Sequence, residues 1–167
     1  MITISLCMIV KNEEKVLARC LDSIADLMDE IIIVDTGSSD NTKEIAKKYT
    51  DKIYDFAWID DFSAARNYSF SKATKEYIYV ADADEVIDAD NHRKLAELKE
   101  VLIPEIEIVQ MRYCNQLTNG TAYNFDEEYR PKLYKRQREF TWIEPVHEMV
   151  RLDPVVYDSE IDILHMP

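Results

Sequence analysis

The feature that most limits the fold is an alternation of two kinds of segment through the first 102 residues. Short apolar segments, each suited to one strand, are 2–10, 30–35, 52–56 and 77–82. Segments with helical spacing or capping residues follow them, at 12–27, 42–49, 60–73 and 88–102. Strands that alternate with helices form a parallel sheet with helices on both faces. We therefore predict an α/β fold here, with Asn12 capping the first helix.

The chain changes character after Pro104, where Glu105 and Glu107 interrupt this alternation. Strand patterns then follow one another, with Thr118-Asn119-Gly120 as a turn between the first two, at 106–117, 121–125, 131–136 and 147–152. A last alternating strand precedes His165. The prediction is a mixed, mainly parallel central sheet flanked by helices, with an antiparallel C-terminal portion. It forms a single domain that spans residues 1–167.

Composition excludes several classes of partner. The net charge of -13, from 33 acidic and 20 basic residues, argues against nucleic acid, because a polyanion is repelled. The apolar N-terminus, residues 1–10, is shorter than the roughly 20 residues that cross a bilayer, so no transmembrane segment is expected. The 3 cysteines are odd in number and widely spaced, which favours a reducing, cytoplasmic location. Peripheral contact with a membrane stays open.

Polar residues collect where three of the predicted strands end. These clusters are 11–12 after the first strand, 35–40 after the second and 82–85 after the fourth. In open parallel sheets, ligands bind beyond the carboxyl ends of the strands. The three clusters therefore predict one binding site at one edge of the sheet.

The acidic residues of these clusters indicate a nucleotide and a metal. Asp35 ends an apolar strand and suits a nucleobase N–H or a ribose hydroxyl as acceptor. Both the GxGxxG fingerprint and the GxxxxGK[ST] loop are absent, so the phosphates of a nucleotide need another counter-charge. Asp82, Asp84 and Glu85 repel one another and call for a positive charge. Their oxygen atoms suit Mg²⁺ or Mn²⁺ rather than zinc, and Glu85 is expected to be structural.

Four motifs carry a resemblance to a known family. In chain order, SLCMIVKNEE, IIIVDTGSSDNT, DDFSAARN and VADADE resemble the family 2 glycosyltransferases of the GT-A fold. The resemblance implies a Rossmann-like nucleotide-binding half at 1–102 and an acceptor-side half at 103–167. It also implies an inverting transfer from a nucleotide-diphosphate sugar, expected to be a UDP-sugar, usually with a divalent metal.

The same resemblance implies roles for individual residues of the first half. Asp35 would bind the base or ribose, as would the chain near Val10 and Lys11. Arg66 would lie near the nucleotide; the residues alone would make it a surface ion pair on a helix. Asp82 would face the ribose and diphosphate, whereas Asp84 would ligate the metal.

The segment FTWIEPVHEMV resembles the acceptor-side segment of the family. An inverting transfer needs a base that takes the proton of the acceptor hydroxyl. The resemblance assigns this role to Glu148, with His147 as an orienting residue or ligand; alternatively, both are strand residues that face solvent. Glu144 is a rival base and stands where many relatives have a glycine. His165 resembles a late histidine of the family that completes the metal or diphosphate site. Relatives often add helices after this histidine, so we expect the chain to be a catalytic core or to have a truncated C-terminus.

Two other functions fit parts of this pattern. A domain that binds a nucleotide sugar or metal without turnover would use the same residues, and Glu144 and the chain end favour it. A haloacid-dehalogenase-like phosphatase would use DADEV as its DxDx[TV] element. That element normally ends the first strand and needs a later acidic pair, which the sequence lacks. The donor sugar, the acceptor (lipid, polysaccharide, peptide or protein) and the oligomeric state stay open.

Overall fold

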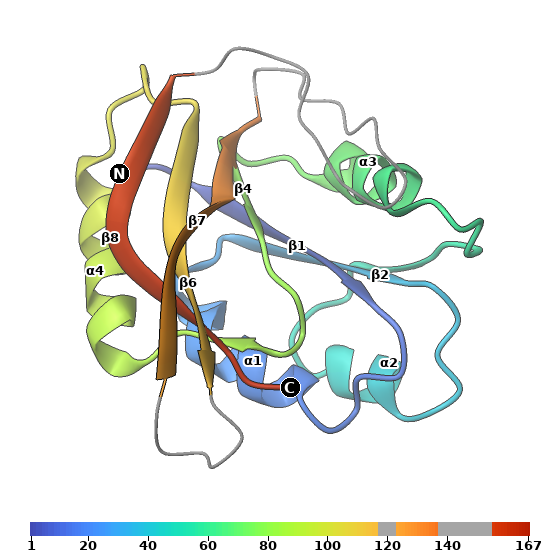
Figure 1. Ribbon diagram of the computed structural model, residues 1–167. Coiled ribbons are helices and arrows are strands. Elements are labelled where there is room, and N and C mark those ends of the chain that lie inside the picture. The colour runs from blue at the N-terminus through green and yellow to red at the C-terminus, as the bar shows by residue number, and fades with distance from the viewer. Residues whose placement is uncertain (117–122, 137–154) are drawn as a thin grey trace.

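The computed structural model describes residues 1–116, 123–136 and 155–167 (Figure 1). Within these ranges the chain forms one mixed eight-stranded sheet in the order β3-β2-β1-β4-β7-β6-β8-β5. The strands are β1 Ile4–Val10, β2 Glu30–Asp35, β3 Ile53–Asp55, β4 Tyr77–Val80, β5 Glu85–Val86, β6 Ile108–Gln116, β7 Tyr123–Lys135 and β8 Val156–His165. The helices are α1 Leu17–Ile24, α2 Thr42–Ala46, α3 Phe62–Lys72 and α4 Ala89–Val101, with a 3-10 helix at Ala25–Leu27. The predicted mixed α/β sheet is confirmed.

Strand β1 lies at the centre of the parallel part, between β2 and β4. Successive side chains of a strand point to opposite faces, so a strand covered on both sides is apolar throughout. Ile4, Leu6 and Met8 accordingly pack in one core cluster, and Cys7 packs in a second cluster on the other face. This arrangement explains why the first apolar segment shows no clean alternation of apolar and polar residues.

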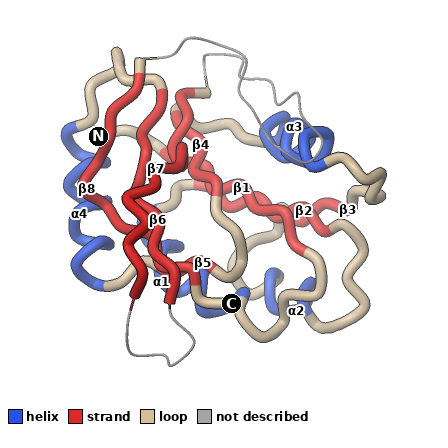
Figure 2. The backbone as a smooth tube through the Cα atoms, viewed as in Figure 1, coloured by secondary structure: helices blue, strands red, loops and turns tan. Residues whose placement is uncertain are grey.

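Helices cover both faces of the parallel strands (Figure 2). Leu17 and Leu21 of α1, together with Leu95 of α4, belong to the larger core cluster. Tyr68 and Phe70 of α3 pack against the smaller cluster on the opposite face. The predicted helices on both faces are therefore confirmed. None of the described helices is long and apolar enough to cross a membrane.

Side chains cap two of the helices, whereas the cap predicted at Asn12 is wrong. The side chain of Asp61 accepts a hydrogen bond from Ala64 N at the start of α3, and Asp88 caps α4. Asn12, however, has a positive φ of 52° and lies five residues before α1, which begins at Leu17. Its side-chain oxygen accepts from Ser39 N at 2.8 Å, so it joins two loops rather than capping a helix.

The C-terminal part departs from a simple series of hairpins. The sequence predicts two strands at 121–125 and 131–136, but the single strand β7 spans Tyr123–Lys135 and is antiparallel to β4 and β6. Strand β8 is parallel to β6 and lies on the opposite side of β6 from β7. Strand β5, which sequence patterns did not predict, pairs antiparallel with β8. The turn at 118–120 and the strand at 147–152 lie outside the described residues.

Candidate functional site

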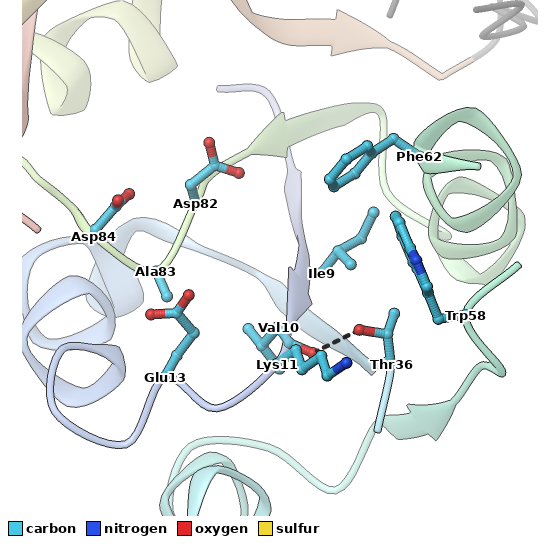
Figure 3. A pocket seen from close by; sticks show the side chains of 10 residues that line it. All are labelled: Ile9, Val10, Lys11, Glu13, Thr36, Trp58, Phe62, Asp82, Ala83 and Asp84. Carbon is cyan, nitrogen blue, oxygen red and sulfur yellow. Dashed lines mark hydrogen bonds between the residues drawn. The ribbon is translucent and has the colours of Figure 1, made fainter. Parts of the chain in front are cut away.

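A pocket of about 350 Å³ opens at the carboxyl ends of β1, β2 and β4 (Figure 3). This volume lies in the range of small-molecule sites, roughly 300–1,000 Å³. Its described lining residues are Ile9, Val10, Lys11, Glu13, Thr36, Trp58, Phe62, Asp82, Ala83 and Asp84. Residues of all three sequence clusters, represented by Lys11, Thr36 and Asp82, therefore line one pocket, as expected for the edge of a parallel sheet.

The loops that follow β1 and β2 hold each other by hydrogen bonds. Asn12 N donates to Ser38 Oγ at 2.9 Å, and Glu13 N donates to Thr42 Oγ1 at 2.8 Å. Thr42 N in turn donates to Asp40 Oδ1 at 2.9 Å. These bonds satisfy backbone groups of the two loops without regular structure and hold the loops together.

Asp35 ends β2, and hydrogen bonds from the described residues occupy only one of its two carboxylate oxygens. Its side chain is buried, and its Oδ1 accepts hydrogen bonds from Gly37 N and Ser38 N, each at 2.8 Å. Gly37 has a φ of 118°, a backbone conformation that residues with a side chain rarely adopt, so a glycine is needed in this turn. Oδ2 is buried and has no hydrogen-bond partner among the described residues. A buried acceptor left unpaired is costly, which points to a donor supplied by a ligand.

The segment 82–85 divides between ligand-facing and structural side chains. Asp82 is exposed and Asp84 half-buried, and both line the pocket. Glu85 is buried and pairs with Lys132 of β7, with Glu85 Oε1 2.5 Å from Lys132 Nζ. The same Oε1 accepts from Asp82 N at 3.1 Å. The Glu85–Lys132 pair thus fixes the backbone that carries the two aspartates.

His165 of β8 lies against Asp84. Its Nε2 is 2.8 Å from Asp84 Oδ2, and Met166 N donates to Asp84 O at 2.7 Å. The imidazole also packs against Tyr113, whose ring centroid is 5.4 Å away, and the guanidinium carbon of Arg130 lies 3.6 Å from that centroid. Residues 81 positions apart in sequence are therefore joined at the acidic end of the pocket.

Glu13, Asp82 and Asp84 bring three carboxylates to the acidic end of the pocket. Burial, together with the carboxylates of Asp84 and Asp82, raises the pKa of Glu13. Arg66 of α3 is buried, and its Nη2 lies 3.9 Å from Asp82 Oδ1. The surface ion pair considered for Arg66 is therefore wrong, because this side chain points inward to the sheet edge. A bound cation would lower the repulsion among the three carboxylates.

The donor set fits a divalent cation completed by a ligand. Asp84 and His165 offer an oxygen and a nitrogen that face each other at 2.8 Å. Among the described residues, no group of three or more His, Cys, Asp or Glu side chains is arranged to hold a metal alone. Magnesium is commonly bound by one or two carboxylates plus substrate phosphates and water, which matches two protein donors beside an open pocket.

The structure gathers most of the predicted site residues. Four of them line the pocket, namely Val10, Lys11, Asp82 and Asp84. Arg66 and His165 contact the lining residues Asp82 and Asp84, and Asp35 directly precedes the lining residue Thr36. Glu148, His147 and Glu144 lie outside the described residues. Sequence reasoning missed Glu13, Trp58 and Phe62. Glu13 follows the first strand cluster by one position, so the strand-end argument could have found it.

Comparison with known families gives one match over most of the chain. The model described as "Glycosyl transferase family 2" matches residues 5–150. The prophage-derived glycosyltransferase SunS of Bacillus subtilis is 41% identical over 125 residues, which cover 73% of this chain and 29% of that protein. A TPR repeat-containing protein of Synechococcus elongatus is 36% identical over 150 residues, which cover 90% of this chain and 36% of that protein. The chain thus spans about a third of these relatives.

Solved structures show the same fold at low sequence identity. S. aureus TarS 1-349 matches with a TM-score of 0.68 and 16% identity, over 98% of this chain and 60% of that chain. Glucosyl-3-phosphoglycerate synthase from Mycobacterium tuberculosis, solved with Mn²⁺ and UDP-glucose, matches with a TM-score of 0.55 and 22% identity. That match covers 67% of this chain and 44% of the synthase.

Proposed function

Because the chain belongs to glycosyl transferase family 2, we propose that it moves a sugar from a nucleotide-diphosphate sugar to an acceptor hydroxyl. The donor is a UDP-sugar, and the transfer inverts the anomeric carbon with the help of a divalent metal. The observation that carries the proposal is the spare, buried Oδ2 of Asp35 at the same sheet edge as the Asp84–His165 pair. One end can accept from a nucleoside, and the other can hold a metal-bound diphosphate.

The residues at the first end select and orient the nucleoside. Oδ2 of Asp35 accepts a hydrogen bond from an N–H of the base or from a ribose hydroxyl. Oδ1 already accepts hydrogen bonds from two backbone N–H groups, which hold the carboxylate in place. Val10 and Lys11 line the pocket and contact the bound nucleoside. A hydrogen bond to a charged acceptor is stronger than one between neutral groups, so Asp35 contributes to the affinity for the nucleoside and to its orientation.

The residues at the second end hold the leaving group. Asp84 and His165 are the protein ligands of Mn²⁺ or Mg²⁺, and Asp82 faces the ribose and diphosphate beside Arg66. A divalent cation bound there supplies stabilisation of the charge that builds on the departing diphosphate. The synthase solved with Mn²⁺ and UDP-glucose, and TarS solved with UDP at a TM-score of 0.61, support this assignment.

The base belongs to the acceptor side. Glu148 takes the proton of the acceptor hydroxyl as that oxygen attacks the anomeric carbon from the face opposite the diphosphate. His147 orients Glu148 or the acceptor, and Glu144 is the rival base. These roles rest on the family resemblance of the sequence segment alone.

A panel of UDP- and GDP-sugars tests the proposal. The purified chain is incubated with each sugar and Mn²⁺, and release of the free nucleotide diphosphate is measured, while calorimetry measures binding of UDP and GDP. Release from one sugar donor is the expected result. Binding of UDP without release from any donor would support a binding domain without turnover. Binding of neither nucleotide would contradict the transferase and the binding domain alike.

A further inference from the structure

The pocket has an exposed aromatic wall that the proposed roles above do not use. Trp58 is 36% exposed and Phe62 is 43% exposed, and both line the pocket. Large aromatic side chains exposed together in a concave site are costly unless a ligand covers them. Figure 3 places both rings on the opposite side of Ile9 from Asp82 and Asp84.

Local structure holds these two rings in place. Their centroids are 4.7 Å apart at an interplanar angle of 71°, an edge-to-face contact. The indole Nε1 of Trp58 donates to Asp60 Oδ1 at 2.9 Å, and Asp60 adopts a positive φ of 57°. Asp61 then caps α3, of which Phe62 is the first residue. The strained turn and the cap orient the rings before a ligand arrives, which lowers the entropy cost of binding.

The two ends of the pocket together specify one kind of ligand. One end is apolar and aromatic, with Ile9, Trp58 and Phe62, and the other carries the carboxylates of Asp82 and Asp84. A metal ion alone would use only the acidic end, and an apolar acceptor would use only the aromatic end. A nucleoside diphosphate has a flat π-system at one end and an anion that binds through a cation at the other.

We propose that Trp58, braced by Phe62, is the stacking platform for the nucleobase of the donor nucleotide. This inference rests on the proposed function and deepens it by assigning the base to the aromatic end of the pocket. Thr36 lines the same end and directly follows Asp35, so the stacked base lies beside the strand end that carries the spare carboxylate oxygen. Stacking supplies affinity through the face of the base, whereas Asp35 reads its hydrogen-bonding edge.

Calorimetric titration of UDP in the presence of Mg²⁺ tests the platform. Base–aromatic stacking loses roughly 5- to 140-fold in affinity on truncation to alanine. We expect Trp58→Ala to weaken UDP binding within that range, and Trp58→Phe, which keeps a ring, to stay close to the wild type. Tyr157→Ala is the matched control, because Tyr157 is 44% exposed on β8 and does not line this pocket.

Fluorescence gives a second measurement that does not depend on truncating the platform. The sequence has 2 tryptophans, Trp58 and Trp142, so the Trp142→Phe variant reports Trp58 alone. Titration with UDP in the presence of Mg²⁺ should change the fluorescence emission of Trp58 in that variant. The midpoint of this change should equal the Kd measured by calorimetry.

The outcomes separate this inference from the proposed function. Undiminished UDP affinity in Trp58→Ala, or no change of Trp58 emission at saturating UDP, would overturn the stacking role while leaving the nucleotide site intact. Equal losses in Trp58→Ala and Trp58→Phe would also overturn it, since a ring at this position would then contribute nothing. A wild-type chain that binds neither UDP nor GDP would instead contradict the proposed function itself.

Discussion

Removing one partner of the buried Glu85–Lys132 pair should be among the most damaging single changes in the described part of the chain. The side chain of Lys132 is 6% exposed and that of Glu85 is 4% exposed, with Oε1 and Nζ 2.5 Å apart. Lys132→Met keeps most of the volume but leaves Glu85 without its cation. Breaking a buried pair in this way costs about 3–5 kcal/mol of unfolding free energy. For a chain of 167 residues that is a fall in Tm of roughly 6–20 °C.

The pH dependence of the variant follows from Glu85. Burial raises the pKa of Glu85, and Lys132 opposes this rise. The folded state therefore keeps the proton to a higher pH than the unfolded chain, whose glutamates titrate near about pH 4.3. Stability from this group is complete below that pH and is lost as the pH rises through the raised pKa. Without Lys132 the pKa rises further, so Lys132→Met should lose more stability than the wild type as the pH rises above about 4.3.

Thermal unfolding followed by circular dichroism measures both effects, with two matched variants. The double variant Glu85→Met, Lys132→Met should recover most of the lost stability, since no unpaired charge stays buried. Arg93→Met breaks an exposed pair with Glu97 on α4 and should leave Tm unchanged. A loss of less than about 1 kcal/mol in Lys132→Met would show instead that the buried pair contributes no more than an exposed pair.

Three further predictions concern the site and its frame. Asp35→Asn should weaken UDP binding by about 1.5–3 kcal/mol in calorimetry, because a charged acceptor is lost, and equal affinity would exclude Asp35 from the nucleotide site. Glu148→Gln should bind UDP normally but lose transfer, measured as UDP release; retained activity would point to Glu144. Burial tends to raise the pKa of Glu30, but bonds from its neighbours outweigh this and lower the pKa to about 2. Stability from Glu30, roughly 3 kcal/mol, is thus present above about pH 4.3 and lost as the pH falls toward 2, a slope that Glu30→Gln should flatten.

The positions of the site residues followed from the sequence where they depend on strand ends. Buried parallel strands are apolar throughout, so the polar residues that end them are conspicuous, and Asp35, Asp82 and Asp84 stand out in this way. The meeting of these residues at one edge then follows from parallel pairing alone. Lys11, which lines the pocket, likewise follows the end of an apolar strand and is predicted in the same way.

Contacts that depend on tertiary packing were out of reach of the sequence. Trp58 and Phe62 lie in a loop and at the first residue of a helix, where an apolar side chain gives no sign of whether it faces the core or a pocket. The Glu85–Lys132 pair joins residues 47 positions apart through a two-residue strand, which is too short to leave a pattern. The side chain of Asn12 suits a helix cap and so predicts one, whereas its actual bond joins it to a loop 27 residues away in sequence.

In the proposed function, Asp84 couples metal binding to nucleotide binding at this sheet edge. Calorimetric titration of UDP, with and without Mn²⁺, tests it in the wild type, in Asp84→Ala and in the control Asp90→Ala, whose side chain lies on the exposed side of α4. We predict that Mn²⁺ strengthens UDP binding in the wild type and the control, and that Asp84→Ala binds UDP no more tightly with Mn²⁺ than without it. Undiminished Mn²⁺-dependent UDP binding in Asp84→Ala would contradict this coupling and the metal role of Asp84.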